Sequence, residues 1–591
     1  MCGIFGTIGS NSVANTLDAL AQLEYRGYDS VGIAVKVDNG LQVYKDVGRV
    51  YNLVVDTSKG NLAIGHTRWA THGKVCKANA HPFVSYDGNF AVVHNGIVEN
   101  YQRHKIALQR QGVEFVSTTD SEVIAHLLAK HFEGDVVSTL RKVAAMLTGS
   151  FAVVVATSFD NNLYAFRQGS AMCVGRGSNG VCVCSDVTVV GQFATSVAVL
   201  PDGCVARLCK DSITAYVGKN AVDLAYFSPD CQDDGLADTT NDFMLSEIMQ
   251  IPKAIRQTFD YYFASGGLCL TKKDVKRIKQ VYFVGCGTAY HSALVGCSLL
   301  QKFTNVPCQA VIASEYIYDN YFTNVNTLVV AISQSGETAD TLKAVEKAKK
   351  HGATVYAVTN VCNSSLCFAS NYVKYIKAGR EVSVASTKAY NCQLVALTLL
   401  VLDLATQKGC MSARQRKRYI AEFAQVPHLC RQLLADEQRY KSLAHKYSNV
   451  KAVYFVGRRL DIATAKEGAL KLKEISYVFA EAYPSGELKH GTLAVMDSDV
   501  LVVAVSCERD LVDKCSNTIA EVTSRGASAM VVSCYAVDTS KAQMVALPTV
   551  NEIFAPIVAV IPLQLFAYFF AKQRNCDVDR PRNLAKSVTV E

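Results

Sequence analysis

The sequence lacks the features that mark secreted, membrane-bound and nucleic-acid-binding proteins. No basic and then apolar leader opens it, which favours a cytoplasmic protein. Its 60 Lys and Arg residues nearly balance its 52 Asp and Glu residues, so a formal charge of +8 spread over 591 residues predicts neither nucleic acid nor membrane as a partner. The densest basic run, at 414–418, is typical of a solvated helix face. The charge remains compatible with anionic small substrates.

Cysteine is plentiful, but its pattern excludes the usual cysteine-rich classes. The 21 cysteines are an odd number, their spacings form no disulfide framework, and no C-x-x-C occurs. A structural zinc site or a thioredoxin-like redox pair is therefore not expected. We expect free thiols in a reducing compartment, most of them small core residues.

One apolar run, at 553–571, is about long enough to cross a bilayer. It is interrupted by Gln564 and contains Pro556 and Pro562, which we expect to break its regularity. Because it lies near the end of a chain that otherwise has the composition of soluble domains, we interpret it as buried helical core.

The length predicts three or four globular units. The first ~225 residues alternate β-rich runs with polar loops and with helical stretches near 15–25 and 121–131, which is typical of a mixed α+β domain. The β-rich runs lie at 62–64, 90–93, 151–156 and 187–190. A polar, aperiodic stretch at 228–242 marks a linker. The predicted boundaries are 2–225 for the domain and 226–244 for the linker.

Beyond the linker the chain repeats itself. The run VYFVG at 281–285 recurs at 453–457, and LVVAIS at 328–333 recurs as LVVAVS at 501–506, at nearly the same shift. Continuous apolar strands separated by helices indicate buried parallel sheets. The repeat therefore predicts two doubly wound α/β domains, at 270–408 and 440–575, followed by a tail at 576–591.

The two copies differ in one loop that follows a strand. The first copy reads SQSGET at 333–338, where hydroxyls and backbone N–H groups at a helix N-terminus suit a phosphate. The second reads SCERD at 506–510, where the carboxylates of Glu508 and Asp510 would repel one. One anion site per chain is expected, and a helix cap without a ligand is the alternative.

Cys2 suggests covalent chemistry at the start of the chain. Removal of Met1 would leave a thiol and a free α-amine on one residue. A terminal amine with a pKa of about 7.7–8.0 can accept the thiol proton without a histidine partner. The hypothesis is an N-terminal nucleophile, and a chance cysteine is the alternative.

Polar residues of the first domain supply the other groups that amide cleavage requires. The Asn95 side chain and the Gly96 N–H are candidates for an oxyanion hole. Arg68 could bind a substrate carboxylate and Asp120 an ammonium group. The histidines of this region have no metal-ligand spacing, so no metal site is expected.

Together the motifs resemble a known family. Those of the first domain are CGIFG at 2–6, YRGYDS at 25–30, HTRWATHG at 66–73, NAHP at 79–82, HNGIVEN at 94–100 and TDSE at 119–122. They are similar to the class II glutamine amidotransferase domain. The likeness continues through GCGTAYH at 285–291, ISQSGETADT at 332–341, VASTKAY at 384–390, EGALKLKEISY at 467–477, GELKHGTLA at 486–494 and PRNLAKSVTVE at 581–591. The whole chain resembles the glutamine–fructose-6-phosphate aminotransferases (isomerizing), or glucosamine-6-phosphate synthases.

The resemblance implies an α+β N-terminal nucleophile (Ntn) glutaminase domain followed by two doubly wound α/β SIS (sugar isomerase) domains. It makes Cys2 the nucleophile, Asn95 with Gly96 the oxyanion hole, and Trp69 the gate of an ammonia channel. The glutamine contacts that it implies are Arg68, Thr71, His72 and Asp120.

For the sugar lobe the resemblance implies a phosphate loop and a set of catalytic side chains. The implied fructose 6-phosphate contacts are Cys286, Gly287, Thr288, Ser333, Gln334, Ser335, Thr338, Val384 and Ser386. By resemblance Glu474 moves the proton between C1 and C2, and Lys471 assists at the sugar oxygens. His490 opens the furanose ring, and Lys586 in the tail meets the C2 carbonyl.

The spacing of three charged residues can also be interpreted without the family resemblance. Glu467, Lys471 and Glu474 fall at i, i+4 and i+7, so a helix would place them on one face. A solvated row of salt bridges is the alternative. The chain departs from the family pattern at Ala289, at Thr492 and in GRRL at 457–460, which bears on substrate affinity and loop rigidity more than on the reaction.

The expected activity is glutamine hydrolysis at Cys2, internal transfer of ammonia, and conversion of fructose 6-phosphate into glucosamine 6-phosphate for hexosamine biosynthesis. No cofactor is implied, neither metal nor pyridoxal phosphate, and the family suggests a homodimer. Two alternatives are a sugar-phosphate sensor without turnover and another class II amidotransferase, such as the phosphoribosyl type. The catalytic side chains argue against the sensor, and the duplicated lobe argues against the other transferase.

Overall fold

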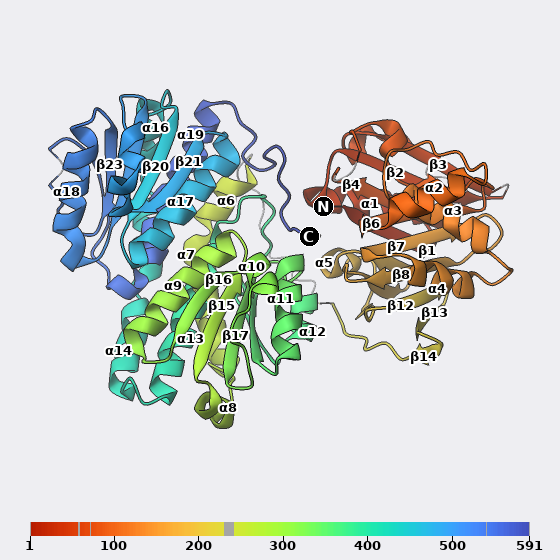
Figure 1. Ribbon diagram of the computed structural model, residues 1–591, viewed down its shortest axis with the longest axis horizontal. Coiled ribbons are helices and arrows are strands. Elements are labelled where there is room, and N and C mark those ends of the chain that lie inside the picture. The colour runs from red at the N-terminus through yellow and green to blue at the C-terminus, as the bar shows by residue number, and fades with distance from the viewer. Residues whose placement is uncertain are drawn as a thin grey trace. The chain divides into compact units, whose positions relative to one another are not determined.

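The computed structural model describes residues 2–38, 40–56, 60–70, 73–229, 242–538 and 540–589. They form two compact units (Figure 1). The first contains the described residues up to 229 together with 587–589, and the second contains 242–586. Residues 230–241 of the predicted linker lie outside the described ranges.

The first unit is built on two seven-stranded antiparallel sheets. The first sheet has the order β11-β9-β10-β1-β4-β2-β3, with strands β1 Gly3–Gly9, β2 Ser30–Val37, β3 Gly40–Val47, β4 Leu62–Arg68, β9 Cys173–Gly177, β10 Gly180–Cys184 and β11 Ser196–Val199. The second has the order β14-β13-β12-β8-β7-β6-β5, with strands β5 Phe83–Val84, β6 Phe90–Val98, β7 Gly149–Thr157, β8 Leu163–Gln168, β12 Cys204–Cys209, β13 Ser212–Val217 and β14 Asn220–Val222.

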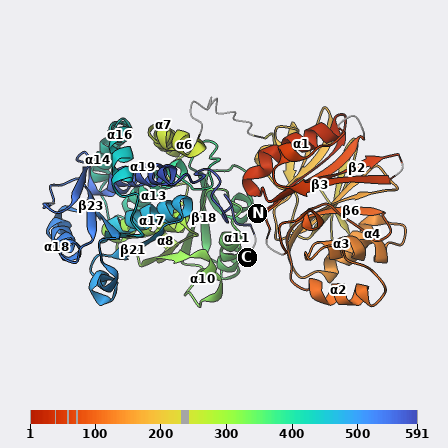
Figure 2. The same cartoon turned by 90° about the horizontal axis from the view of Figure 1, so that it is seen from above.

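Helices cover the outer faces of both sheets, which gives four layers (Figure 2). The helices are α1 Ser12–Leu23, α2 Tyr101–Gln109, α3 Glu122–His131, α4 Val136–Met146 and α5 Val187–Val190. Apolar side chains of the two facing sheets, such as Ile64 and Val154, fill the space between the sheets. Because its sheet is covered on both faces, β1 is buried along its whole length instead of alternating.

Most of the elements predicted for this unit are confirmed, and one is wrong. The predicted helices near 15–25 and 121–131 correspond to α1 and α3, and three of the four β-rich runs lie in β4, β6 and β7. The run at 187–190 is a helical turn, α5, and not a strand. The Asp186 carboxylate caps it by accepting the N–H groups of Thr188 and Val189 at 2.7 and 3.3 Å, a tertiary arrangement that overrides the β propensity of valine.

The second unit confirms the predicted duplication. Two five-stranded parallel sheets have corresponding orders, β16-β15-β17-β18-β19 and β21-β20-β22-β23-β24. Their register also matches, since Val281 pairs with Leu328 in one and Val453 with Leu501 in the other. The strands are β15 Gln280–Gly285, β16 Cys308–Ile312, β17 Thr327–Ser333, β18 Thr354–Thr359, β19 Tyr372–Tyr375, β20 Ala452–Gly457, β21 Phe479–Pro484, β22 Val500–Ser506, β23 Ser528–Ser533 and β24 Gln543–Ala546.

Helices flank both parallel sheets and join them through one core. They are α6 Phe243–Met249, α7 Ile251–Ala264, α8 Lys272–Arg277, α9 Thr288–Phe303, α10 Ala313–Tyr318, α11 Ala339–Lys350, α12 Ser365–Ala369, α13 Lys388–Gln407, α14 Ala413–Phe423, α15 Val426–Leu434, α16 Glu437–Lys446, α17 Leu460–Ser476, α18 Val512–Thr523 and α19 Ala555–Gln573. Helix α9 packs against α13 and α17, and α17 packs against α19, so both lobes share one hydrophobic cluster. This packing brings the first turn of α9 to the face of α17 that carries Glu467 and Lys471.

Two helices among the described residues are long and apolar enough to cross a membrane, Lys388–Gln407 and Glu552–Gln573. Their apolar windows are 94% and 100% buried inside the unit, so the interpretation of 553–571 as helical core is confirmed. The expected break is wrong, because α19 continues through Pro562. The predicted basic helix face is also confirmed: 414–418 lies in α14, whose N-terminus is closed by a capping box of Ser412 at the N-cap and Gln415 in the first turn.

Candidate active sites

Three distant segments meet at Cys2. The Trp69 N–H donates to Cys2 Sγ at 3.2 Å, and Asn95 Nδ2 donates to the backbone carbonyl of Cys2 at 2.9 Å. They meet because β1 pairs with β4, while β6 lies in the facing sheet. Burial raises the pKa of the Cys2 thiol, and the Trp69 N–H and the Arg68 guanidinium act in the opposite direction. A thiol in this position needs a base before it can attack an amide.

His66 fixes the orientation of Asn95. Its Nε2 lies 3.1 Å from Asn95 Oδ1 and 3.0 Å from the His94 carbonyl. Both oxygens accept, so Nε2 carries the hydrogen. Burial lowers the pKa of His66 to about 3, which keeps the ring neutral. Asn95 therefore turns its NH₂ group toward Cys2, as an oxyanion donor requires. His66 is the first residue of the motif HTRWATHG, but nothing in the neighbouring sequence indicates that it orients Asn95.

Gly96 continues strand β6 with a φ of +120°. A Cβ at this position would lie 2.0 Å from the Ser150 carbonyl of the paired strand β7. Only glycine allows this close backbone approach. The residue following Asn95 is therefore fixed by strand pairing, and the two proposed oxyanion donors stay adjacent.

The residues expected to bind the two ends of an amino acid are both buried. Arg68, at the end of β4, is 3% exposed and donates to two carbonyls of the following loop at 3.3 and 3.4 Å. Asp120 is 3% exposed and accepts a backbone N–H of β6 at 2.8 Å. Burial lowers the pKa of Arg68, and Asp120 is among the neighbouring groups that oppose this shift. Thr71 and His72 lie outside the described residues.

In the second unit, strand β17 ends in the predicted loop of hydroxyl groups. Ser333 Oγ lies 2.9 Å from Thr338 Oγ1 and accepts the Gly336 N–H at 3.0 Å. Ser335 Oγ accepts the Glu337 N–H at 3.2 Å. The loop is thus held by its own hydroxyls directly before helix α11, an arrangement suited to a phosphate.

The adjacent loop after β15 contains Cys286 and Gly287. Gly287 has a φ of +52° and is the residue before α9. Burial, followed by the charge of Asp340, raises the pKa of Cys286 to about 11, so its thiol stays protonated. A protonated thiol is a poor nucleophile, which disfavours covalent chemistry at Cys286. The Gln334 carbonyl accepts the Asn360 N–H at 3.1 Å, which ties the β17 loop to the next strand connection.

A chain of charged side chains joins α9 to α17. Lys471 Nζ lies 2.6 Å from Glu474 and 3.4 Å from Glu467, and it donates to Thr288 Oγ1 at 3.1 Å. The Glu467 carboxylate also accepts from Thr288 at 3.0 Å and lies 2.7 Å from His291 Nδ1. Glu467 and Lys471 are fully buried, which excludes the solvated salt-bridge row as the explanation.

The protonation state of Lys471 follows from these contacts. Burial alone would lower the pKa of Lys471, but the carboxylates of Glu474 and Glu467 outweigh it and raise the pKa. Glu474 remains 20% exposed at its side chain. A charged lysine thus lies beside a carboxylate that a substrate can still reach.

The C-terminal tail reaches a second buried carboxylate. Lys586 Nζ lies 2.5 Å from Glu381 Oε2, and Ser386 Oγ donates to the same oxygen at 2.8 Å. Burial would raise the pKa of Glu381, yet Lys586 outweighs it and the pKa falls to about 2. The Val384 N–H donates to the Asp579 carbonyl at 3.0 Å, which anchors the tail beside this loop. No local pattern points to Glu381, because its partner is 205 residues away.

Among the described residues, the side chains of two expected site residues form no hydrogen bond with these clusters. His490 ends a 3-10 turn, Glu487–His490, and is exposed, without a hydrogen bond to any residue in the described ranges. The half-buried Trp69 ring lies edge-on to the Tyr28 ring, with 5.7 Å between the ring centroids. Among the described residues no group of three or more His, Cys, Asp or Glu side chains is arranged to hold a metal ion.

Comparison with known proteins identifies the parts of the chain. The model of the glutamine amidotransferase domain matches residues 66–189. The model of the SIS domain matches twice, at 275–403 and 446–571, once for each parallel sheet.

Solved structures cover the second unit. The C-terminal domain of glucosamine-fructose-6-phosphate aminotransferase from Francisella tularensis is 37% identical with a TM-score of 0.56, over 58% of this chain and 99% of that one. Tagatose-6-phosphate ketose/aldose isomerase from Escherichia coli is 17% identical with a TM-score of 0.51, over 59% and 97%, and shows a shared fold alone.

Full-length relatives share the whole architecture. Glutamine–fructose-6-phosphate aminotransferase (isomerizing) from Caldanaerobacter subterraneus subsp. tengcongensis is 39% identical over 612 residues, and that from Symbiobacterium thermophilum is 40% identical over 612, each covering 100% of both chains. A match to the amidotransferase domain, with the half-buried Cys2 in the same unit, and two SIS domains with a lysine–glutamate cluster thus occur in one chain. The chain therefore belongs to the glutamine–fructose-6-phosphate aminotransferase (isomerizing) family.

Proposed function

We propose that this chain hydrolyses glutamine at Cys2 and transfers the ammonia to fructose 6-phosphate, forming glucosamine 6-phosphate and glutamate. Full-length identity to enzymes with that name supports the reaction. The observation that carries the proposal is the coexistence of the Cys2–Asn95 contact with the Lys471–Glu474 pair. One arrangement serves amide cleavage, and the other serves proton transfer on a sugar phosphate.

For glutamine hydrolysis, we propose that the α-amine released by removal of Met1 takes the thiol proton of Cys2. The thiolate attacks the amide carbon, and the oxyanion accepts hydrogen bonds from Asn95 Nδ2 and the Gly96 N–H. Arg68 and Asp120 hold the carboxylate and the ammonium of the substrate, and Thr71 and His72 complete its contacts. The orientation of Asn95 by His66 supports this assignment.

For sugar isomerisation, we propose that the loop with Ser333, Ser335 and Thr338 binds the phosphate. The other proposed contacts are Cys286, Gly287, Thr288, Gln334, Val384 and Ser386. Glu474 then moves a proton between C1 and C2, and the buried ammonium of Lys471 stabilises charge on the sugar oxygens. The contacts of Thr288 with Lys471 and Glu467 support a site formed by both SIS domains.

His490 and Lys586 are proposed to act on the open and closed forms of the sugar. His490 opens the furanose ring, and its exposure leaves it accessible to a ligand. Lys586 meets the C2 carbonyl, for which it must leave its pair with Glu381. Trp69 is proposed to gate the passage of ammonia, which keeps the reactive free base away from bulk water.

The assembly and location of the protein are further proposals. The family resemblance supports a homodimer, without nucleic acid or membrane as a partner. All twenty cysteines in the described ranges are free thiols, which supports a cytoplasmic location. The SIS matches weigh against a phosphoribosyl-type amidotransferase.

One coupled assay tests the function. Glutamate and glucosamine 6-phosphate are measured from glutamine with fructose 6-phosphate and, separately, with other hexose phosphates. We expect equimolar glutamate and amino sugar with fructose 6-phosphate. Binding of fructose 6-phosphate without any amino sugar would establish the sensor instead.

A further inference from the structure

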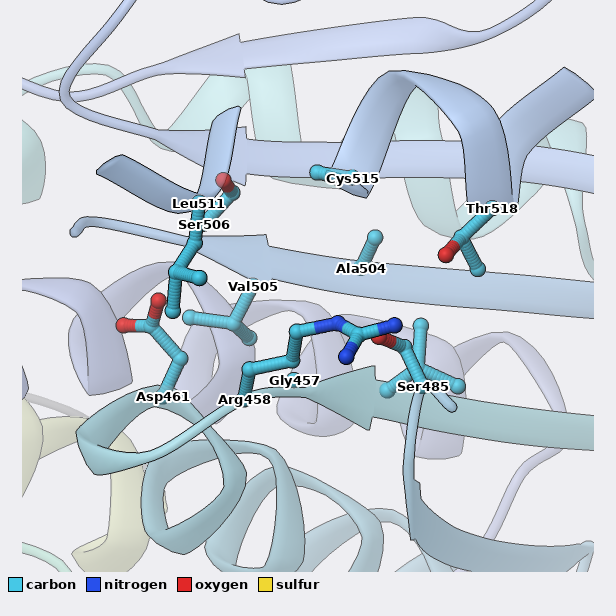
Figure 3. Close-up of a pocket in the computed structure, with 11 residues that line it drawn as sticks. Gly457, Arg458, Asp461, Ser485, Ala504, Val505, Ser506, Leu511, Cys515 and Thr518 are labelled. Carbon is cyan, nitrogen blue, oxygen red and sulfur yellow. The ribbon is translucent and has the colours of Figure 1, made fainter. Parts of the chain in front are cut away.

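The second SIS domain contains a hollow at the same place as the phosphate loop of the first. It lies at the carboxyl ends of β20 and β22 and has a volume of about 260 Å³ that includes open solvent (Figure 3). Polar residues that line it are Arg458, Asp461, Ser485, Ser506 and Thr518. In open parallel sheets, ligands bind beyond the carboxyl ends of the strands. The duplicated strand order thus places a second candidate site here.

Arg458 is the residue that points to a ligand. It follows β20, and its guanidinium extends across the hollow toward Ser485 (Figure 3). Its Nε is buried and has no hydrogen-bond partner among the described residues, and none of the described carboxylates forms an ion pair with it. A buried guanidinium N–H without an acceptor is costly, and an oxyanion would satisfy it.

Hydroxyl groups of the same hollow can complete the binding of an oxyanion. Ser506 ends β22 at the position that Ser333 has in β17. Its side chain is 2% exposed and has no oxygen or nitrogen partner within the described residues, the Cys515 thiol being its polar neighbour. Ser485 is also buried, at the end of β21. These two hydroxyls line the space together with the Arg458 guanidinium, while the third lining hydroxyl, that of Thr518, donates to the Lys514 carbonyl at 2.9 Å.

The carboxylates near the hollow either have partners of their own or face water. Glu508 pairs with Arg459 at 3.1 Å and accepts the Leu460 N–H at 3.0 Å. Asp461 accepts the Cys507 N–H at 2.9 Å, and burial raises the pKa of Asp461 to about 7. Asp510 is exposed to water. The local charge that an anion would meet is thus dominated by Arg458.

We propose that the second SIS domain binds inorganic phosphate, or the phosphate group of a small metabolite, between Arg458, Ser485 and Ser506. This site is separate from the loop at 333–338 in the first SIS domain and does not depend on the proposed reaction. The proposal adds a second anion site to the one expected in the first SIS domain.

The test is equilibrium dialysis of the full-length protein with radiolabelled inorganic phosphate. Wild type should bind one phosphate per chain more than the variant Arg458→Gln. Removing the charge-assisted bonds should weaken the second site by about ten- to a hundredfold. Arg525→Gln is the matched control, because Arg525 is an exposed arginine of the same domain and lies outside the hollow. It should bind as wild type does.

Two further variants keep the result interpretable. Ser506→Ala removes a hydroxyl without adding volume and should weaken the same site even if Arg458→Gln folds poorly. Ser335→Ala should weaken only the other site.

Competition with glucose 6-phosphate decides which phosphate the site binds. Displacement of the label at a lower concentration than by unlabelled phosphate indicates a metabolite, and equal displacement indicates free phosphate. Equal phosphate binding by wild type, Arg458→Gln and Ser506→Ala would overturn the proposal.

Discussion

Lys586 and Glu381 form a buried ion pair at 2.5 Å although 205 residues separate them. Their side chains are 3% and 0% exposed. A second buried carboxyl, that of Glu247, lies close by, where burial followed by the charge of Glu381 raises its pKa to about 8. Lys586 therefore balances the ionised Glu381 while Glu247 stays protonated, and the tail is held by charge as well as by packing.

Glu381→Gln should impair amino-sugar synthesis while sparing glutamine hydrolysis. The variant leaves Lys586 without its ionised partner, and breaking a buried pair of this kind costs about 3–5 kcal/mol. We expect at least a tenfold fall in glucosamine 6-phosphate formation, with glutamate formation retained. Glu346→Gln, which removes an exposed pair with Lys350, is the control and should change neither rate. An unimpaired synthesis rate would separate Glu381 from the sugar site.

The pair also predicts a dependence of stability on acid. The pKa of Glu381 is lowered to about 2 in the folded protein, so its contribution is complete above the unfolded pKa near 4.5. The contribution is lost as the pH falls from there toward 2. Chemical unfolding at pH 5 and pH 3 should show a smaller loss for Glu381→Gln than for wild type. A loss of the same size in both proteins would contradict this.

Glu474→Gln should abolish isomerisation without removing sugar-phosphate binding. The amide keeps the shape of the side chain but cannot accept a proton, and general-base catalysis contributes about 10²–10⁴-fold. We expect a fall of that order in amino-sugar formation, with fructose 6-phosphate still bound in a direct binding assay. Glu481→Gln, which removes a more exposed pair with Lys473, is the control.

His66 should make the first unit sensitive to acid. Burial lowers the pKa of His66 to about 3, so between about pH 6.5 and 3 the unfolded chain binds a proton that the folded chain does not. Stability therefore falls as the pH is lowered through this range, by up to about 1.4 kcal/mol per pH unit for one histidine. His66→Gln should reduce this slope and also slow glutamine hydrolysis, since Asn95 loses its orienting donor. The measurements are unfolding at several pH values and glutaminase kcat.

Cys2→Ala should remove glutamine-dependent activity alone. Without the thiol no acyl intermediate can form, whereas externally added ammonia should still support glucosamine 6-phosphate formation. An uncleavable tag that retains Met1 should have the same effect, because the proposed base is then absent. Cys76→Ala, a half-buried thiol of the same unit, is the control. Glutamine turnover by the tagged enzyme would remove the terminal amine from the mechanism.

Truncation from Asn583 onward should separate the two half-reactions. It removes Lys586, so amino-sugar synthesis should stop while glutamine hydrolysis continues. The measurement is the ratio of glucosamine 6-phosphate to glutamate formed. A ratio equal to that of the full-length protein would exclude Lys586 from the sugar site.

The sequence by itself determined the fold class and the main clusters of polar residues. Strand periodicity and the repeat are local properties, so the two parallel sheets and the face of α17 with Lys471 and Glu474 could be predicted. The local sequence pattern predicted the wrong structure where side chains outside the segment determine its conformation. Asp186 makes a helical turn of a valine run, and the buried environment of α19 accommodates Pro562.

Only the tertiary structure decided which distant groups meet. The contacts of Asn95 with His66, of Lys586 with Glu381 and of Thr288 with Lys471 join segments that no periodicity relates. The reason is physical: spacing along a helix or strand fixes the face of a residue, whereas its partner, its burial and its pKa depend on packing between elements. For the same reason the Nε–H of Arg458, which has no acceptor among the described residues, became visible only in the folded chain.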